Sequence, residues 1–445
     1  MSFQSLGFAT HVPRIDPSLT TYIAISVACF VPVLLWGLLK ASCLHSRRDK
    51  PQGCRKLGLG STSYLADEFD ERYKGAVAGQ HKGSATWRVK SLWIYPVKSC
   101  RGVELETGTV IGTGMEYDRQ FSFAQLSSKF PVSANTPREE KAKHTWKFIT
   151  QRTLPPMATI KTEVWVPDSS SPTYSEWHPN IRSGGVLVIK FPHIQCEEGF
   201  MGKVKDLLAL VSAQPEKEVH IPFNPTQEQI SDKGYAVDDM EIWKDKPRSL
   251  IIASTEKDDR WIQELRSYLG ITNHFALFRV SKDDQPREVY RCAPRKDKLG
   301  YQPTVGFQDA YPLHILNLAS VRDVGDKLQK GAPPLSARNF RPNIVITGGG
   351  AYEEDCWKRI RIGGYQYYVS CRTVRCLLPN VNPITGKRHG SEPNRTLKDF
   401  RCIDAGDPKN ACLGMQMVPA SEDSRIRVGD EVNVLETGEH LYIKQ

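Results

Sequence analysis

The stretch YYVSCRTVRCLLPNVNPITGKR, residues 367–388, joins a predicted β-strand to a rigid turn and carries two cysteines. Tyr367 and Val369 favour strands, and a segment of alternating apolar and basic residues before Gly363 predicts the other arm of a hairpin. After Cys376 the chain is rich in Pro, Asn, Thr and Gly, which favour turns. The pattern therefore predicts that Cys376 lies at the end of a strand, on a loop with little freedom to move.

Two arginines, Arg372 and Arg375, flank the thiol of Cys376. Nearby cations lower the pKa of a thiol and favour the thiolate, the form that reacts as a nucleophile or binds a metal. The alternative is that Cys371 and Cys376 are small buried hydrophobic side chains, as most free cysteines are. A CxxxxC spacing without a nearby histidine is not a common zinc pattern. The residues of this stretch leave both interpretations open.

Further motifs occur in order along the chain, outside the opening stretch as well as within it. They are YPVKSCRGV (95–103), EYDRQF (116–121), FRPNIVITGGGAYEEDCW (340–357), Arg375-Cys376 followed by NPITG, and IRVGDEVNVL near the C-terminal end. This set resembles the MOSC family, in particular its amidoxime-reducing members, which are molybdenum enzymes of the mitochondrial outer membrane. The resemblance covers residues 86–437.

The resemblance implies a molybdenum cofactor, Mo-molybdopterin, and assigns residues to it at matching positions. Cys376 would be the catalytic residue and the thiolate ligand of molybdenum. The cofactor-binding positions would be Lys98, Ser99, Arg119, Asp309, Arg341, Asn343, Arg375 and Cys376. An ammonium group, a hydroxyl group and guanidinium forks are the donors that a buried phosphate requires. Each residue alone is also common as a surface or structural residue, so the assignment depends on their joint occurrence.

The resemblance also bears on further positions, and at some of them this sequence differs from the pattern that is common in the family. Gln151 and Arg152 fall in a segment similar to the family and would border a substrate entrance, although the pattern favours a surface strand. The chain has Gln416 where an aromatic residue is common in the family. The longer CRTVRC spacing implies that Cys371 has no counterpart role.

The fold class that the resemblance implies is α+β and mostly β, with an N-terminal MOSC-type β-rich domain and a C-terminal MOSC β-barrel domain, preceded by one transmembrane helix. The reaction implied is the reduction of the N–O bond in a small N-hydroxylated substrate, such as an amidoxime. No motif indicates a flavin, haem or nicotinamide site. The resemblance therefore implies that electrons come from a b-type cytochrome and its NADH-dependent reductase.

Two other functional classes remain as alternatives to an N-reductase. One is a protein that binds or transfers the molybdenum cofactor or carries sulfur, as the C-terminal part of the molybdenum cofactor sulfurase does. The other is a non-catalytic, membrane-tethered binding module whose cysteine is structural.

Residues 21–39 predict a transmembrane signal anchor. Residues 22–39 form an uncharged run of 18 residues, about the minimum length that spans a bilayer. The basic residues follow the run, and no cleavage site or polar face supports a signal peptide or a core helix. The positive-inside rule then places the catalytic part in the cytosol. The resemblance implies the mitochondrial outer membrane.

Composition excludes other classes of protein. The chain of 445 residues has a net charge of +10, but half of this excess lies in residues 1–56. No basic stripe interleaved with aromatic residues is present, which argues against a nucleic-acid partner. The 11 cysteines are scattered and odd in number, so they form no disulfide framework and indicate a reducing compartment.

The sequence predicts five parts, with polar surface insertions in the fourth. They are an N-terminal tail (1–20), the anchor (21–39), a flexible tether (40–85), the N-terminal β-barrel-type domain (86–285) with insertions at 126–147, 167–185 and 222–247, and the MOSC domain (286–437). Within them, residues 256–269 predict an amphipathic helix that stops at Gly270. Residues 309–328 predict a strand that leads into a helix.

Overall fold

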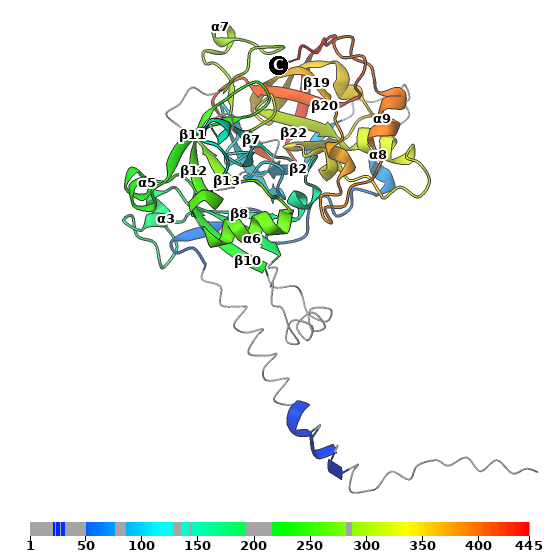
Figure 1. The fold of residues 1–445 in the computed structure, drawn as a ribbon. Helices are drawn as coiled ribbons and strands as arrows, with labels where there is room; N and C mark the ends of the chain where they lie inside the picture. Colours follow the sequence, from blue (N-terminus) through cyan, green and yellow to red (C-terminus); the bar gives the residue numbers. More distant parts are fainter. Residues whose placement is uncertain are drawn as a thin grey trace, which may run out of the picture. The chain divides into compact units, whose positions relative to one another are not determined.

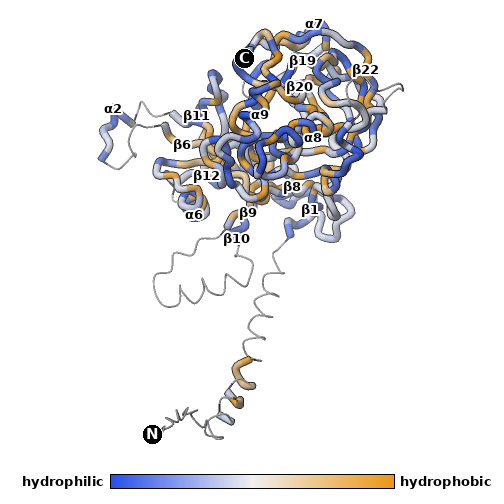
Figure 2. Tube along the Cα trace, turned by 90° about the vertical axis from the view of Figure 1, so that its right-hand side faces the viewer, coloured by the Kyte–Doolittle hydropathy of each residue, from blue (hydrophilic) through white to orange (hydrophobic). Residues whose placement is uncertain are grey.

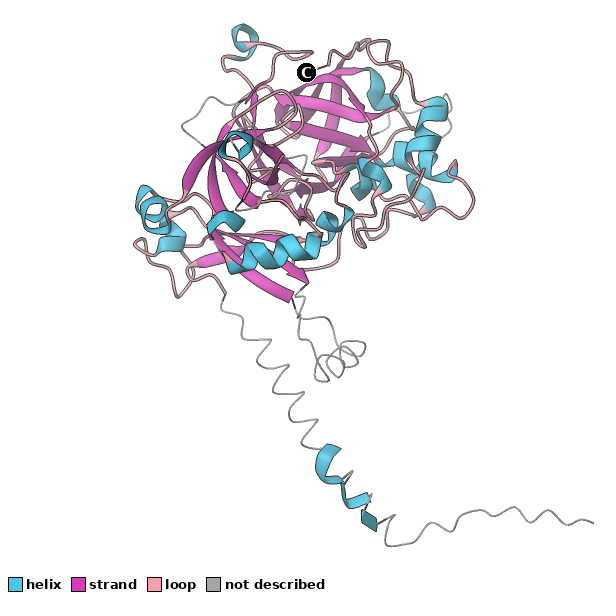
Figure 3. Cartoon of the chain, in the orientation of Figure 1, coloured by secondary structure: helices cyan, strands magenta, loops and turns pink. Residues whose placement is uncertain are grey.

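The computed structural model describes residues 21–22, 24–26, 28–31, 50–75, 86–127, 135–141, 145–192, 216–257, 259–281 and 287–444. The chain divides into two compact units, Met1–Gln52 and Gly53–Gln445, and each is described by itself. Strands dominate the second unit (Figures 1 and 3), which confirms the mostly β fold expected from the sequence.

In the first unit, the described residues between 21 and 31 are helical, and Figure 2 shows hydrophobic positions among them. No helix within the described residues is both long and apolar enough to cross a membrane. The predicted tail 1–20 and residues 32–39 of the predicted anchor lie outside the described residues.

Seven strands of the second unit form a ring. They pair in the order β17-β16-β20-β19-β18-β22-β2, with β3 beside β2, and an additional pairing of β17 with β2 joins the two ends. Their bounds are β2 (Trp87–Ile94), β3 (Val103–Leu105), β16 (Leu313–Asn317), β17 (Ile344–Thr347), β18 (Trp357–Ile362), β19 (Tyr365–Val374), β20 (Cys412–Pro419) and β22 (Glu431–Thr437). The ring agrees with the expected C-terminal β-barrel. Because β2 belongs to the predicted N-terminal domain, the ring uses strands from both predicted domains, and the boundary at 285 stays a prediction.

The β18–β19 hairpin confirms the pattern around residues 357–369. Ile362 faces Tyr365 in the register, and Gly363 adopts a φ of 55°, which a residue without a Cβ reaches at no steric cost. Tyr367 and Ile360 are fully buried. The hairpin thereby anchors β19, whose C-terminal end leads to Cys376.

A second closed barrel contains strands in the order β11-β12-β13-β6-β7. Their bounds are β6 (Phe121–Leu126), β7 (Trp146–Phe148), β11 (Ala236–Glu241), β12 (Arg248–Ser254) and β13 (Phe275–Val280). The rings of Phe123 and Phe275, on the paired strands β6 and β13, stack with their centroids 5.1 Å apart. The predicted insertion 222–247 is not only a loop, because it supplies β11 and the capped helix α5 (Gln227–Lys233).

A four-stranded sheet follows the order β1-β8-β9-β10, and shorter elements complete the unit. Helix α6 (Arg260–Leu269) buries Ile262, Leu265 and Leu269 and ends at Gly270 with φ 67°, as the sequence predicted. The remaining bounds are β1 (Cys54–Lys56), β4 (Thr107–Ile111), β5 (Gly114–Met115), β8 (Lys161–Pro167), β9 (Val186–Pro192), β10 (Glu216–Pro222), β14 (Arg287–Glu288), β15 (Thr304–Val305), β21 (Asp423–Arg427), α2 (Arg138–Lys141), α3 (Pro179–Arg182), α7 (Lys296–Leu299), α8 (Leu318–Asp326), α9 (Asn394–Phe400), η1 (Glu71–Tyr73), η2 (Pro155–Thr159), η3 (Thr255–Lys257), η4 (Ala337–Phe340), η5 (Glu353–Cys356) and η6 (Leu378–Asn380). Strand β16 and helix α8 confirm the strand-to-helix prediction for residues 309–328.

The expectation of a flexible tether over residues 40–85 is wrong for residues 53–75. Strand β1 pairs with β8, and Leu65 is 1% exposed within a hydrophobic cluster that includes Trp93. The buried Glu68 carboxylate accepts hydrogen bonds from Ser336 Oγ (2.7 Å) and the Ala337 backbone N–H (2.9 Å). Scattered apolar residues with polar hydrogen-bond anchors therefore order a segment whose polar composition suggested a linker.

We predict that Glu68→Ala lowers the free energy of unfolding by about 1–3 kcal/mol, because two buried donors lose their acceptor. Glu71→Ala is the matched control, since the Glu71 side chain is 77% exposed, and it should change stability by less than about 0.5 kcal/mol. Denaturant unfolding of the full-length protein measures both. Equal stability of the two variants would show that residues 53–75 do not support the fold.

Candidate cofactor site

Lys98 lies on the turn after β2 and is 5% exposed. Its ammonium group donates to the Phe307 carbonyl oxygen (2.8 Å) and to Asp309 Oδ1 (2.6 Å). Burial lowers the pKa of Lys98, and the Asp309 carboxylate opposes that effect. The indole of Trp243 also donates to Asp309 Oδ1, at 3.1 Å. The structure thus brings together two of the predicted residues that lie far apart in the sequence.

Three of the predicted residues have unusual backbone conformations. Of the seven non-glycine residues with positive φ in the described part, three are Ser99 (66°), Arg119 (46°) and Arg341 (52°). A left-handed conformation is costly for residues that carry a Cβ, and such strain concentrates at functional sites. The backbone therefore supports a functional role for these three positions, independently of their side chains.

The guanidinium groups of Arg119 and Arg341 both lie over the ring of Tyr95, at 4.4 and 4.1 Å from its centroid. Arg119 Nη1 pairs with Asp118 Oδ2 at 2.7 Å, and Nη2 donates to the Arg341 carbonyl oxygen at 3.1 Å. An aromatic face stabilises a cation by about 0.5–2 kcal/mol. Tyr95, directly after β2, therefore contacts two guanidinium groups, of which Arg119 also has a carboxylate partner.

Arg341 is 8% exposed and follows η4. Its Nη1 donates to Gln151 Oε1 at 3.2 Å, while Arg341 Nη2 and Gln151 Nε2 are buried and have no hydrogen-bond partner among the described residues. Burial lowers the pKa of Arg341 to about 10, and the Arg119 cation adds to this effect. Two buried donors without acceptors, on side chains that contact each other, indicate a position for an acceptor-rich ligand.

Gln151, which the resemblance placed at the border of a substrate entrance, is not among the cofactor-binding residues that the sequence analysis named. The pattern favoured a surface strand, but Gln151 lies in a turn and is fully buried. The one available signal was that the segment FITQRTLPP is similar to the family. Hydrophobic periodicity could not identify it, because the burial of Gln151 comes from contacts distant in the sequence.

Asn343 has a structural role in the ring. Its Oδ1 accepts a hydrogen bond from the His314 backbone N–H (3.2 Å), and its Nδ2 donates to the Trp93 carbonyl oxygen (3.2 Å). The side chain thus links β16 to β2 at the position where Arg341 enters the site. These two hydrogen bonds position the neighbouring residues, and they do not depend on a bound ligand.

Arg375, directly after β19, is buried with backbone carbonyls and a histidine rather than a carboxylate. Its Nε donates to the Leu413 carbonyl oxygen (2.8 Å), and its Nη2 lies 2.6 Å from His314 Nε2. Burial lowers the pKa of Arg375 to about 9. Because His314 Nε2 accepts from a guanidinium group, the proton of the neutral ring resides on Nδ1.

Cys376 is exposed, as expected for a residue on the loop after the strand. Its Sγ accepts one hydrogen bond, from the Leu378 backbone N–H at 3.4 Å. Arg372 was expected to flank the thiol, but its guanidinium group pairs with Asp404 at 3.1 Å. Arg375 is the buried cation that directly precedes Cys376 in the sequence.

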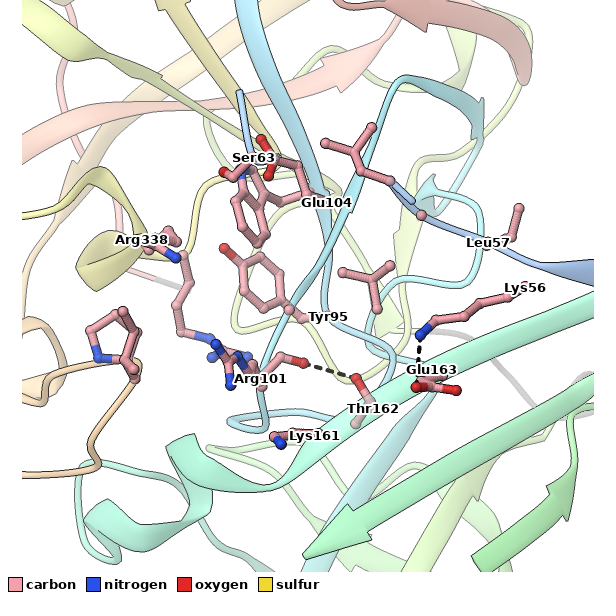
Figure 4. A pocket seen from close by; sticks show the side chains of 18 of the residues that line it. Lys56, Leu57, Ser63, Tyr95, Arg101, Glu104, Lys161, Thr162, Glu163 and Arg338 are labelled. Carbon is pink, nitrogen blue, oxygen red and sulfur yellow. Dashed lines mark hydrogen bonds and ion pairs between the residues drawn. The ribbon is translucent and has the colours of Figure 1, made fainter. Parts of the chain in front are cut away.

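A pocket of about 310 Å³ adjoins this region, and Arg341 is the one predicted residue that lines it. Figure 4 shows Arg338 extending toward Arg101 across the pocket. Arg338 forms an ion pair with the Glu68 carboxylate at 3.8 Å. The pocket lining also contains the carboxylates of Glu104 and Glu163, so it holds charges of both signs.

The comparisons with known proteins assign the chain to a family. Residues 86–173 match the MOSC N-terminal beta barrel domain, and residues 302–433 match the MOSC domain. The chain belongs to the MOSC family, a family of proteins associated with the molybdenum cofactor.

Its relatives include mitochondrial amidoxime-reducing components of mammals. Component 2 of Bos taurus is 26% identical over 349 residues, which covers 77% of this chain and 82% of the relative. Component 1 of Mus musculus is 27% identical (78% and 82%), and component 1 of Homo sapiens is 25% identical with the same coverage. A solved structure of the YuaD protein from Bacillus subtilis aligns over 32% of this chain and 71% of that chain at 12% identity, with a TM-score of 0.17 that is too low to support an argument.

We predict that His314 makes folding stability depend on pH. Burial and the Arg375 cation lower the pKa of His314 well below its ordinary value of 6.5. The unfolded chain therefore binds a proton below about pH 6.5 that the folded chain does not, and stability falls as the pH decreases, by at most about 1.4 kcal/mol per pH unit.

Denaturant unfolding is measured between about pH 7.5 and about pH 5. The loss of stability with falling pH should be shallower for His314→Gln than for the wild type, because the variant lacks the group that takes up the proton on unfolding. His440, whose pKa burial also lowers, is present in both proteins and cancels in the comparison. Parallel pH profiles would mean that His314 titrates normally in the folded protein.

Proposed function

We propose that this protein is a molybdenum-dependent oxidoreductase that reduces the N–O bond of N-hydroxylated compounds such as amidoximes. The observation that carries the proposal is the geometry around Cys376. An exposed thiol follows a buried arginine without a carboxylate partner, in a MOSC-family chain whose relatives are named amidoxime-reducing components. This favours a thiolate that binds metal over a structural cysteine.

The residues present fit Mo-molybdopterin as the cofactor. Lys98, Arg119, Arg341 and Arg375 place four buried or partly buried cations in one region, where Asp118 and Asp309 supply the carboxylates. The excess positive charge suits the phosphate of the cofactor. The free donors of Arg341 and Gln151 suit a polar group at the same place.

When bound, the cofactor supplies two-electron redox chemistry at molybdenum. Cys376 would provide the protein thiolate that binds the metal. Lys98 and Arg341 would neutralise the phosphate. The hydroxyl of Ser99, a residue with a left-handed backbone, would be a further hydrogen-bond donor. Arg375 would hold the start of the loop that carries Cys376, through its hydrogen bonds to Leu413 and His314.

Electron supply and location complete the proposal. We propose that electrons arrive from a b-type cytochrome and its NADH-dependent reductase, as the family resemblance implies. The apolar run at 21–39 and the basic residues after it support a single-pass anchor with the catalytic part in the cytosol. The relatives are named mitochondrial, which supports the mitochondrial outer membrane.

Cys376→Ser tests the metal-ligand assignment. We predict loss of amidoxime reduction and lower molybdenum content, because a serine hydroxyl is a poor ligand where a thiolate is required. Stability should change by less than about 1 kcal/mol, because an exposed side chain contributes little packing. The measurements are turnover with a reconstituted electron-transfer chain, metal analysis and thermal unfolding.

Cys356→Ser is the matched control, because Cys356 is also exposed, and it should keep both activity and metal. Full activity of the Cys376 variant would reject the ligand assignment. A wild-type protein that binds the cofactor and never reduces the substrate would instead indicate a cofactor-transfer role.

Lys98→Met tests the phosphate contact separately from the metal. A charge-assisted hydrogen bond contributes about 1.5–3 kcal/mol, so we predict pterin binding roughly tenfold to a hundredfold weaker. Lys147→Met is the control, because Lys147 is 54% exposed and pairs with Glu241. Pterin content after gel filtration is the measurement, and equal retention by both variants would contradict the contact.

A further inference from the structure

Cys292 and Cys371 meet in a small cluster outside the candidate cofactor site. Cys371 lies in β19 and is fully buried, whereas Cys292 lies between β14 and α7 and is half-buried. Cys292 packs against the cluster that contains Cys371 and Tyr311. Both are free thiols, so the fold brings together two cysteines that are distant in the sequence, one of them reachable from solvent.

Hydrogen bonds distinguish the two thiols. Cys371 and the Ile443 backbone N–H both donate to the sulfur of Cys292, and the Cys371 bond is the main reason why the pKa of Cys292 falls to about 6, against the opposing effect of burial. The neutral Cys292 thiol can donate to the Leu441 carbonyl oxygen, at 3.4 Å. The pKa of Cys371 is raised well above its ordinary value, because it is the donor and because it is buried.

This asymmetry differs from that of two ordinary core cysteines. A pair of buried hydrophobic thiols would both keep their protons. Here the half-buried sulfur accepts hydrogen bonds, whereas burial and its role as a donor favour the protonated form of the buried one. Cys292 also has a φ of 54°, a conformation that a cysteine rarely adopts, so its sulfur is held in place by the surrounding structure.

A metal site does not explain the pair. Among the residues that the structure describes, no group of three or more His, Cys, Asp or Glu could hold a metal ion. Asp404 acts on both sulfurs as a distant negative charge, but its carboxylate is engaged by Arg372 and by the Tyr442 backbone N–H (2.8 Å). Two neighbouring thiols can, without a third ligand, form a disulfide.

We propose that Cys292 is a peroxide-reactive thiol and that Cys371 is its resolving partner, forming a reversible modification site. The Cys292 thiolate attacks one oxygen of a hydroperoxide and breaks the O–O bond, which gives a sulfenic acid and, after protonation, an alcohol or water. The Cys371 thiol then attacks the sulfenic sulfur and forms the S–S bond with release of water. The two sulfurs lose two electrons in total, and the hydroperoxide gains them.

The position of this site has a consequence for β19. Cys371 is five residues before Cys376 in the sequence, and the disulfide would tie the loop between β14 and α7 to that strand. The proposal does not depend on the redox function of Cys376, because it concerns only thiols and a peroxide.

The experiment uses the reduced full-length protein, freed of reductant and treated with hydrogen peroxide, with dimedone present to trap sulfenic acid. In the wild type we expect a disulfide-linked pair of peptides containing Cys292 and Cys371. Cys371→Ala should instead accumulate a dimedone adduct on Cys292, because the resolving thiol is missing. Cys292→Ser should give neither product. Circular dichroism and thermal unfolding of each variant verify that it is folded.

Alkylation rates provide a second readout that does not need peroxide. At pH 6 about half of Cys292 is thiolate, against about 0.3% of an ordinary thiol. After allowance for the weaker nucleophilicity of low-pKa thiolates, we expect Cys292 to alkylate roughly tenfold faster than the half-buried Cys402. Cys371→Ala should move the pH midpoint for Cys292 upward, because it removes the main donor.

Two results would overturn the proposal. One is a wild-type protein in which both cysteines stay free after peroxide while Cys402 is oxidised. The other is a stable dimedone adduct on Cys292 in the wild type, equal to that in Cys371→Ala, which would show that Cys371 does not resolve the sulfenic acid.

Discussion

The pairing of β2 with β17 is the constraint on which the candidate site depends. Trp93 and Asn343 exchange hydrogen bonds across this pairing, through the Trp93 backbone N–H (2.8 Å) and the Asn343 side chain (3.2 Å). The turn after β2 carries Lys98, and the turn before β17 carries Arg341. Closing the ring therefore brings together basic groups that the sequence separates by more than two hundred residues.

The cost of this arrangement is electrostatic. Arg341 and Arg375 are buried without a carboxylate partner among the described residues, and the pKa of each is lowered. The structure limits the cost with an aromatic ring beneath Arg341 and with backbone carbonyls around Arg375. Burying a cation without an acidic partner costs free energy, and an anionic ligand at this place would offset that cost.

Sequence patterns predicted the elements that periodicity and turn chemistry define. The β18–β19 hairpin, helix α6 with its stop at Gly270, and the strand-to-helix step at β16 and α8 follow from local signals. The assignment of Lys98 and Asp309 to one site required the family resemblance, because no local pattern links positions so far apart. The burial of Gln151 and of His314 and the order of residues 53–75 were missed, since burial of a polar residue depends on partners that the local sequence does not reveal.

The contribution of β2 to the ring also bears on how the protein is made. About 250 residues separate the end of β2 from the start of β17, which at roughly 5–20 residues per second is about 12–50 s of synthesis. During that interval β2 can pair with β3 alone, while its edge toward β17 has no partner. Trp87, Val89 and Leu92, all buried in the finished ring, lack their packing partners on β17 until that strand is made. An unpaired strand edge of this kind is prone to pair with other chains, so ring closure is the step that ends this exposure.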